Sequence, residues 1–373
     1  MQTWIGADKM RYLLTGGGTG GHIYPAVAIA NEIKRNEKDA EILFVGTEKG
    51  LEKELVPKSG FELKTIRVKG FKRKLSLDTL RTIKIAFDGL IDAKKIIDEY
   101  KPDIVIGTGG YVCGPVVMIA ALKHIPTLIH EQNAFPGLTN RILSRFVDII
   151  ATAFDDSKKY FRNKDNVYVT GNPVRMEILG ANKVQAFKKL GLEPGKKVVV
   201  SVGGSRGAAK INEYMIELIK RVDDDFQILM ITGKNQYDTV IKMIKDYDIK
   251  IGKNIKIIPY CYDMGDVYAV ADIMVCRAGA ITLAELLATS TASILIPSPN
   301  VTHNHQEYNA RVLEKNGAAI AILERELNGD ILYDKVSSIL KDPVVLERMK
   351  SNAKKLSKID ATREIYKLIN DLK

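Results

Sequence analysis

The sequence predicts an α/β protein with two Rossmann-like domains, each built around a parallel sheet. Short apolar, β-branched runs alternate along the chain with longer segments of helical periodicity. Buried strands separated by helices are typical of parallel sheets that helices cover on both faces. The pattern starts twice, because residues 11–14 lead into the glycines at 16–18 and residues 197–202 lead into those at 203–204. An apolar strand, a glycine turn and a helix therefore open each half of the chain.

The apolar runs indicate the expected strands, and the periodic segments indicate helices between most of them. In the first half we expect strands at residues 11–14, 41–45, 63–68, 103–107, 126–130 and 147–152. In the second half we expect them at residues 197–202, 227–231, 255–258, 272–276, 292–296 and 317–322. Helical patterns occupy residues 24–35, 48–58, 78–99, 207–221, 235–246, 281–288 and 304–315, and the charged segment 343–372 is also helical.

The length supports the same division, since 373 residues suggest two domains at roughly 100–200 residues each. The boundary is expected in a polar stretch where Gly171-Asn172-Pro173 is a candidate hinge, because glycine and proline interrupt regular structure. We therefore expect an N-terminal domain at residues 10–172, a C-terminal domain at 173–355 and a final helix at 356–373. Residues 1–9 lack the apolar stretch of a signal peptide and are expected to add nothing to the fold.

Composition narrows the classes of function. Hydrophobic residues make up 46% of the chain, which excludes a disordered protein. The formal charge of +11 favours an anionic partner, although sparse interleaved aromatics argue against single-stranded nucleic acid. The three cysteines lack CxxC spacing, which predicts neither a disulfide framework nor a zinc site and fits a reducing compartment. No apolar run approaches the roughly 20 residues of a membrane-spanning helix.

The first glycine turn, residues 16–21, connects a strand to a helix, so its backbone N–H groups are expected to approach an anion. Its spacing also matches the dinucleotide fingerprint. The second strand, however, ends in Phe44-Val45-Gly46, without the acid that binds ribose in such sites. His22 follows at the junction of loop and helix. It is either a general base, since free histidine titrates near neutral pH, or a residue that packs there.

Further polar residues follow other strands, at the edge where parallel sheets bind ligands. We interpret residues 130–133, His-Glu-Gln-Asn, as a functional rim rather than a helix cap. In the second half, residues 203–208 suit a phosphate. Glu285 lies one turn into a helix, where its carboxylate either binds two sugar hydroxyls or complements the helix dipole. Residues 303–306 suit sugar hydroxyls and lack the carboxylate or cysteine that would complete a metal site.

A basic segment precedes an apolar-rich helix. Residues 64–74 contain six lysines and arginines and no acid. Basic residues beside exposed apolar ones form a membrane-surface patch, and the alternative is a basic loop before an ordinary core-facing helix. The residues of the predicted patch are Lys72, Arg73, Lys74, Leu80, Ile83 and Phe87.

Six motifs occur in one order along the chain: GGGTGGHIYPA (16–26), HEQNAFPG (130–137), TGNPVR (170–175), GGSRGA (203–208), CRAGAITLAE (276–285) and HNHQEYNA (303–310). Together they resemble the MurG family of transferases, which add N-acetylglucosamine to lipid I in cell-wall synthesis. The resemblance covers about residues 10–372 and implies a GT-B architecture, with two Rossmann-like domains facing each other across a cleft. It further implies an inverting hexosyltransferase without a cofactor or an essential metal.

The same resemblance implies the partners and their places. UDP-N-acetylglucosamine would bind the C-terminal domain, and undecaprenyl-linked lipid I the N-terminal domain. The enzyme would lie peripherally on the anionic, cytoplasmic face of the cell membrane. Arg206 stands where some members carry Gln, and Ala278 where some carry Ser, which leaves the fine donor contacts open.

The resemblance also implies roles for single residues. His22 would be the base, and Glu131 is a second candidate because it is a carboxylate of the same rim. Cys261 would offer its backbone to uracil, and Glu285 would bind ribose. The expected donor contacts are Thr19, Gly20, Gly21, Asn133, Arg175, Ser205, Cys261, Ala280, Ile281, Thr282, Leu283, Ala284, Glu285 and Gln306.

Three other hypotheses remain open from the sequence. One is a related UDP-sugar transferase that acts on another lipid acceptor, such as a diacylglycerol or a sterol. Another is a nucleotide-binding oxidoreductase, and a third is a membrane adaptor without catalysis.

Overall fold

The protein was analysed as a computed structural model, which describes residues 9–68, 77–204, 207–222 and 224–373. The chain forms two compact units. The N-terminal unit comprises Met1–Pro173 and Ile359–Lys373, and the C-terminal unit comprises Val174–Lys358. The sequence predicts divisions after residues 172 and 355, and the structure divides the chain after Pro173 and Lys358. Each unit is described by itself below.

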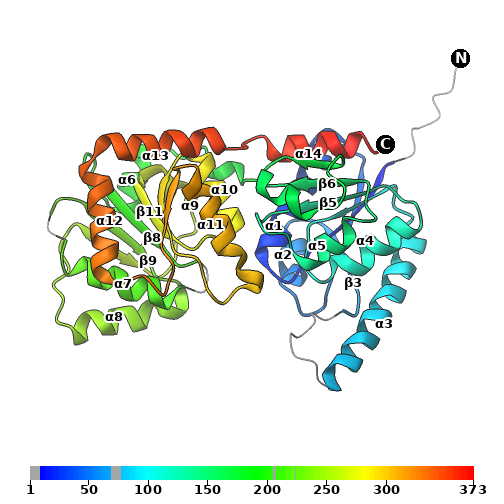
Figure 1. Ribbon diagram of the computed structural model, residues 1–373, viewed down its shortest axis with the longest axis horizontal. Helices are drawn as coiled ribbons and strands as arrows, with labels where there is room; N and C mark the ends of the chain where they lie inside the picture. The colour runs from blue at the N-terminus through cyan, green and yellow to red at the C-terminus, as the bar shows by residue number, and fades with distance from the viewer. Residues whose placement is uncertain (1–8, 69–76, 205–206, 223) are drawn as a thin grey trace, which may run out of the picture. The chain divides into compact units, whose positions relative to one another are not determined.

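The N-terminal unit contains a seven-stranded parallel sheet with the strand order β3-β2-β1-β4-β5-β6-β7 (Figure 1). Its strands are β1 (Arg11–Thr15), β2 (Glu41–Gly46), β3 (Glu62–Thr65), β4 (Ile104–Gly107), β5 (Thr127–Glu131), β6 (Ile149–Thr152) and β7 (Val167–Val169). Its α-helices are α1 (Gly20–Asn36), α2 (Glu52–Lys58), α3 (Leu77–Tyr100), α4 (Cys113–Leu122), α5 (Leu138–Leu143) and α14 (Ala361–Asn370).

The C-terminal unit repeats the plan with a six-stranded parallel sheet in the order β10-β9-β8-β11-β12-β13. Its strands are β8 (Val198–Val202), β9 (Gln227–Ile231), β10 (Ile255–Ile258), β11 (Ile273–Cys276), β12 (Ala292–Leu295) and β13 (Ala319–Ala321). Its α-helices are α6 (Lys183–Leu190), α7 (Ala209–Ile219), α8 (Tyr237–Asp246), α9 (Met264–Val270), α10 (Ala280–Ala288), α11 (His305–Lys315), α12 (Gly329–Lys341) and α13 (Pro343–Leu356). The predicted class, two Rossmann-like α/β domains with parallel sheets, is confirmed.

The differences from the predicted elements have local causes. α4 was missed because Cys113–Leu122 is apolar on nearly every side and so lacks helical periodicity. α6 lies inside the polar stretch expected to be the domain boundary. The segment 343–372, expected to be helical with a final helix from residue 356, is two helices, α13 and α14. The break follows Leu356, where Ser357 has an extended backbone with ψ of 135°, and the chain there passes from one unit to the other.

Successive side chains of a strand enter apolar clusters on opposite faces of the sheet, so both faces are buried. In β1, Leu13 belongs to one apolar cluster, with Val105 and Ile129, whereas Tyr12 and Leu14 belong to the cluster on the other face. Side chains of a strand point to opposite faces in turn, so a sheet covered on both sides needs apolar residues at every position. This explains why the strands could be read as continuous apolar runs.

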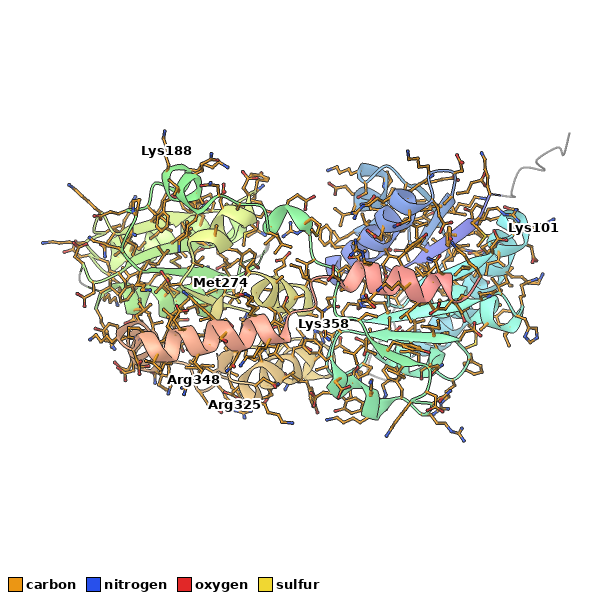
Figure 2. The ribbon with its side chains drawn as sticks, turned by 90° about the horizontal axis from the view of Figure 1, so that it is seen from above. Lys101, Lys188, Met274, Arg325, Arg348 and Lys358 are labelled. Carbon is orange, nitrogen blue, oxygen red and sulfur yellow. The ribbon has the colours of Figure 1, made fainter. Side chains whose placement is uncertain are left out.

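The side chains of the C-terminal unit follow the same rule (Figure 2). Met274 in β11 is fully buried, while Lys188 and Arg348 point outward from helices. Across the described parts of the chain, the helices are all too short or too polar to cross a membrane.

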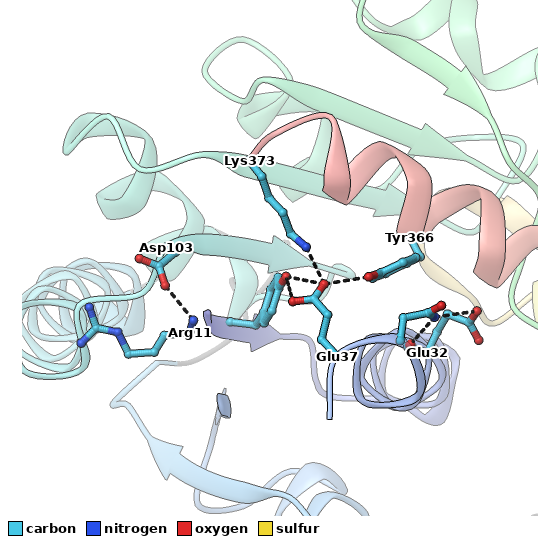
Figure 3. Close-up of polar contacts among 8 residues, drawn as sticks. Arg11, Glu32, Glu37, Asp103, Tyr366 and Lys373 are labelled. Atoms are coloured by element: carbon cyan, nitrogen blue, oxygen red, sulfur yellow. Dashed lines mark hydrogen bonds and ion pairs between the residues drawn. The ribbon is translucent and has the colours of Figure 1, made fainter. Parts of the chain in front are cut away.

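The last helix, α14, packs on α1 of the N-terminal unit. Its Ile365 and Ile369 are fully buried in the apolar cluster that includes Tyr12 and Leu14. A polar cluster closes the contact (Figure 3): the carboxylate of Glu37, just after α1, accepts a hydrogen bond from Tyr366 Oη at 2.7 Å and from Tyr12 Oη at 2.9 Å. Lys373 Nζ donates to the same carboxylate.

We expect Glu37→Gln to loosen α14 in a pH-dependent way. Burial raises the pKa of Glu37, but its three donors together outweigh burial and hold that pKa below its ordinary value of 4.5. A depressed pKa in the folded state means that the stabilisation is present above about 4.5 and is lost as the pH falls through the folded value. At pH 7, replacing charge-assisted hydrogen bonds by neutral ones, a difference of roughly 1 kcal/mol, should speed amide hydrogen exchange in α14 about fivefold.

The measurement is hydrogen–deuterium exchange of the peptide covering α14, as the ratio of variant to wild type at pH 7 and near pH 3. The ratio should fall toward one at the lower pH. Glu54→Gln is the control, because Glu54 pairs only with Lys58 on the surface of α2 and should leave α14 unchanged. An equal ratio at both pH values would contradict the account.

Candidate active site

The first glycine turn is held closely against the loop after β4. Gly17 N–H donates to the carbonyl oxygen of Gly109 over 3.3 Å. A Cβ added to Gly110 would lie 2.3 Å from the carbonyl oxygen of Gly17, so the approach of the two loops requires glycine at that position. α1 begins at Gly20, directly after the turn, and places His22 in its first turn.

A buried carboxylate supports the glycine turn from below. Glu52, fully buried at the start of α2, accepts hydrogen bonds from Gly18 N–H at 3.1 Å and from Thr47 Oγ1 at 2.6 Å. The sequence predicts that N–H groups of this turn approach an anion, but those of Gly17 and Gly18 are engaged within the protein. The N–H groups that remain for an anion are those of the first turn of α1, at Gly20 and Gly21.

His22 lies in a hydrogen-bonded network at the carboxyl ends of β4 and β5. Its Nδ1 is 3.0 Å from the carbonyl oxygen of Thr108 and 3.0 Å from Oε1 of Gln132. Gln132 is buried, and its Nε2 donates to the same carbonyl of Thr108 at 2.8 Å. Both partners of Nδ1 are therefore acceptors, so Nδ1 carries a hydrogen, and in the neutral ring the lone pair is on Nε2.

His130 extends this hydrogen-bond network to the backbone of Gly171. Its Nδ1 accepts a hydrogen bond from Gln132 Nε2 at 3.0 Å, and its Nε2 donates to the carbonyl of Gly171 at 3.0 Å. Complete burial lowers the pKa of His130 to about 4. The ring is therefore neutral at physiological pH and serves as a fixed link, because one nitrogen accepts and the other donates.

The carboxylate of Glu131, the second candidate base, is engaged by the residues that follow β5. Its side chain is 1% exposed, and its two oxygens accept hydrogen bonds from the backbone of Asn133 and Gly137 and from the side chain of Asn140. Asn133 Nδ2 also donates to it, at 3.2 Å. With both oxygens engaged by these donors, the carboxylate of Glu131 orders the loop after β5. These contacts favour a structural role over that of a base.

In the C-terminal unit, two of the predicted residues meet directly. Arg175 donates from Nε and Nη2 to Oε1 of Glu285, at 3.1 and 2.8 Å. The second oxygen, Oε2, accepts a hydrogen bond from the hydroxyl of Tyr268 at 2.9 Å. Burial and the nearby carboxylate of Glu285 raise the pKa of Tyr268 well above 10, so the hydroxyl stays protonated and donates. Tyr268, on α9, is a site residue that the sequence analysis missed.

The residues before Glu285 form the first turns of α10. Ile281, Thr282 and Ala284 are partly exposed, whereas Ala280 and Leu283 are buried. A ligand contact from Leu283 would therefore come from its backbone. Gln306, in the first turn of α11, accepts a hydrogen bond from the N–H of Ser298 through Oε1 at 2.9 Å, which leaves its amide nitrogen directed elsewhere.

Cys261 lies after β10 and is partly exposed, while Cys113 and Cys276 are buried. Burial raises the pKa of both Cys113 and Cys276 to about 12, so these thiols stay protonated. A cavity of about 300 Å³ adjoins this part of the unit, lined among others by Arg175, Lys189, Tyr262, Asp263 and Asp266.

Several predicted residues can be placed only in part. Ser205, Lys72, Arg73 and Lys74 lie outside the described residues, and for Leu80 and Ile83 only the helix, α3, is described. Phe87, further along α3, is 64% exposed. The structure adds apolar residues that the sequence analysis did not single out: Leu138, Ile142 and Phe146, four apart on α5 and the turn after it, are each about half exposed. α4 contacts both α3 and α5.

The two halves of the chain match known domains. Residues 12–152 match the model of the glycosyltransferase family 28 N-terminal domain. Residues 198–365 match that of the glycosyltransferase family 28 C-terminal domain. The chain therefore belongs to glycosyltransferase family 28. The predictions of a glycosyltransferase and of likeness to the MurG family are confirmed.

Individual relatives narrow the comparison. The UDP-N-acetylglucosamine--N-acetylmuramyl-(pentapeptide) pyrophosphoryl-undecaprenol N-acetylglucosamine transferase of Thermoanaerobacter sp. (strain X514) is 63% identical over 363 residues, covering 97% of this chain and 100% of the relative. The protein of the same name from Clostridioides difficile (strain 630) is 48% identical, covering 96% and 88%. The crystal structure of Acinetobacter baumannii MurG matches with a TM-score of 0.79 and 27% identity, covering 97% of this chain and 99% of that one.

Proposed function

We propose that this protein transfers N-acetylglucosamine from UDP-N-acetylglucosamine to the muramyl 4-hydroxyl of undecaprenyl-linked lipid I, forming lipid II for peptidoglycan synthesis. The observation that carries the proposal is the 63% identity to the Thermoanaerobacter transferase over 97% of the chain. The name of that relative specifies both the sugar donor and the pyrophosphoryl-undecaprenol acceptor. Inversion at the anomeric carbon, giving a β-1,4 link, is part of the same proposal.

The donor binds the C-terminal unit through Glu285. Oε2 of this carboxylate accepts a hydrogen bond from Tyr268, and Oε1 accepts hydrogen bonds from the guanidinium of Arg175, whose side chain is 47% exposed. Ribose hydroxyls then replace Arg175 at Oε1, and the guanidinium gains the diphosphate as a new partner. Such an exchange keeps the charge of Glu285 compensated by hydrogen bonds at each stage, as a buried carboxylate requires.

The remaining proposed contacts with UDP-N-acetylglucosamine come from loops and helix starts of each unit. The glycine segment around Ser205, at the start of α7, receives the diphosphate. Cys261 offers its backbone to uracil, the N-terminal residues of α10 enclose the uridine, and Gln306 contacts the transferred sugar. From the N-terminal unit, Asn133 and the first turn of α1, with Thr19, Gly20 and Gly21, complete the donor contacts.

The chemistry needs one proton to be removed. Nε2 of His22 accepts the proton of the muramyl 4-hydroxyl while that oxygen attacks the anomeric carbon of N-acetylglucosamine. The bond from the anomeric carbon to the diphosphate breaks, and UDP leaves with the electron pair. Backbone N–H groups at helix starts and the guanidinium of Arg175 stabilise the negative charge that grows on the diphosphate.

The acceptor carries a lipid, and the protein meets it at the anionic cytoplasmic surface of the cell membrane as a peripheral protein. The membrane patch comprises Lys72, Arg73, Lys74, Leu80, Ile83 and Phe87, extended by Leu138, Ile142 and Phe146. Arg141 and Arg145 are exposed beside the last three, so apolar and basic side chains alternate on this segment. Apolar insertion and attraction to anionic lipid together give stable but reversible binding.

We expect Glu285→Ala and His22→Ala to separate donor binding from catalysis. Removing the carboxylate should weaken UDP binding about tenfold or more, because charge-assisted hydrogen bonds are worth about 1.5–3 kcal/mol. Removing the imidazole should lower kcat by about 10²–10⁴ and leave UDP binding nearly unchanged. Calorimetric titration with UDP and turnover with labelled UDP-N-acetylglucosamine and lipid I measure the two effects.

Glu347→Ala and His124→Asn are the controls, since both side chains are exposed, Glu347 on α13 and His124 in the turn after α4. Full kcat in His22→Ala would remove the base assignment. Turnover with diacylglycerol but not with lipid I would replace the proposed acceptor. Binding of NADH without binding of UDP would discard the transferase altogether.

We expect binding to vesicles that contain phosphatidylglycerol, and we expect it to weaken as salt rises, because salt screens surface charge. Replacing Lys72, Arg73 and Lys74 by Gln should remove the salt-dependent part of binding. Ile142→Ser with Phe146→Ser should lower affinity at every salt concentration, while Val344→Ser, at an even more exposed apolar residue on α13, should not. Co-sedimentation with phosphatidylglycerol and phosphatidylcholine vesicles tests this. Unchanged binding in both variants would refute the patch.

A further inference from the structure

The side-chain amide of Gln132 can be oriented in only one way. Its nitrogen lies 2.8 Å from the carbonyl oxygen of Thr108 and 3.0 Å from that of His130. Carbonyl oxygens only accept, so the atom that faces them must be the NH₂ group. The amide oxygen is thereby turned toward His22, 3.0 Å from its Nδ1.

This orientation determines the state of the imidazole of His22. An amide oxygen cannot donate, so the contact is a hydrogen bond only when Nδ1 carries the hydrogen. The neutral ring then has its lone pair on Nε2, which is the form that can accept a proton there. The ring also lies close to Gly109, since a Cβ added there would be 2.9 Å from Nδ1. Contact from one side and hydrogen bonds at Nδ1 limit rotation of the ring.

Gln132 is itself held by hydrogen bonds to Asn172 and His130. Its backbone carbonyl accepts a hydrogen bond from the side chain of Asn172 at 3.1 Å, and its Nε2 reaches Nδ1 of His130, whose other nitrogen donates to Gly171. Gln132, His130 and Asn172 are all buried. These contacts link Nδ1 of His22 through the amide of Gln132 and the ring of His130 to the carbonyl of Gly171, and the two hydrogens of the Gln132 amide are shared among three acceptors.

We propose that Gln132 is a positioning residue for the transfer reaction: it holds the imidazole of His22 in the Nδ1–H tautomer, with Nε2 open to the acceptor hydroxyl. The proposal rests on the proposed function in one respect, because it takes His22 as the base. It adds a residue that acts through His22 without touching the substrate. A buried amide suits this task, since it fixes the tautomer without adding a charge that would hold a proton on the ring.

Other titratable groups border the network and bear on its pH dependence. His130 lies behind Gln132 in β5, and Glu131 follows it, with its oxygens engaged by the 133–140 loop. Cys113 at the start of α4 is protonated, because burial raises its pKa. Glu52 is on the far side of the glycine turn, bonded to Gly18, and Tyr111 is packed against Gly18. Among the described residues, Nδ1 of His22 contacts a carbonyl and an amide oxygen and none of these carboxylates.

The test replaces the side-chain amide of Gln132 by a carboxylate. In Gln132→Glu, a negative charge beside Nδ1–H stabilises the protonated imidazole, so the base becomes free only at higher pH. We expect the acidic limb of the pH profile of kcat/KM to move upward by about one pH unit or more. Gln132→Met, which removes the acceptor without adding charge, should lower kcat with little change in the KM for UDP-N-acetylglucosamine. The same charge change at exposed Gln185, Gln185→Glu, is the control and should leave the profile in place.

A second measurement does not depend on any variant that might fail to fold. The chain has five histidines, and the ¹⁵N spectrum of the histidine-labelled wild type, with His22 assigned by its loss in His22→Ala, reports the tautomer directly. Protonated Nδ1 with bare Nε2 supports the proposal. The opposite tautomer, or an unmoved acidic limb in folded Gln132→Glu, overturns it. Full turnover of His22→Ala would instead defeat the base assignment, so the two failures are told apart.

Discussion

Burial of both faces of each parallel sheet is the constraint on which the rest of the structure depends. Helices cover the faces, so ligand-facing polar groups can gather only where the strands end. In the N-terminal unit, the buried polar residues Thr15, Thr108, His130, Glu131 and Gln132 all lie at or just beyond the carboxyl ends of β1, β4 and β5. The side chains of Thr108, His130, Glu131 and Gln132 all form hydrogen bonds within the protein, because burying polar groups unpaired is unfavourable.

The two units satisfy this constraint by different chemistry. The hydrogen-bond network around His22 consists of neutral amides, carbonyls and a neutral histidine. These groups orient the imidazole ring without placing a charge beside it. Around Glu285 it is ionic, with a bidentate guanidinium on one oxygen and the hydroxyl of Tyr268 on the other. A neutral surrounding suits a group that must gain and lose a proton, and an ionic one suits a group that must remain charged to accept hydroxyl donors. The division between proton transfer and donor binding follows from these surroundings.

The sequence predicted the strands and glycine turns well because their causes are local. A strand buried on both faces is apolar at every position, and the approach of Gly110 to Gly17 leaves no room for a side chain. α4 was missed for a related reason: a helix that is apolar on nearly every side shows no helical periodicity in its hydrophobic residues. The final helix was expected from residue 356, and α14 begins at Ala361, because residues 357–360 carry the chain from one unit to the other.

The site was predicted less completely, because its geometry depends on contacts between distant segments. Residues 130–133 were recognised as a rim, yet the sequence favoured Glu131 over its neighbour Gln132. Only the fold shows that the carboxylate turns toward the 133–140 loop while the amide turns toward His22. Glu52 and Tyr268 were missed altogether, since each acts on a residue from another loop or helix and neither stands in a distinctive motif.

The most direct test of the account is a crystal structure of the protein with UDP-N-acetylglucosamine bound. The account predicts the ribose hydroxyls within hydrogen-bonding distance of the carboxylate of Glu285, with Arg175 released from Oε1 and the diphosphate at the start of α7. A nucleotide seated instead on the glycine turn of the N-terminal unit, with the Arg175–Glu285 pair intact, would contradict it.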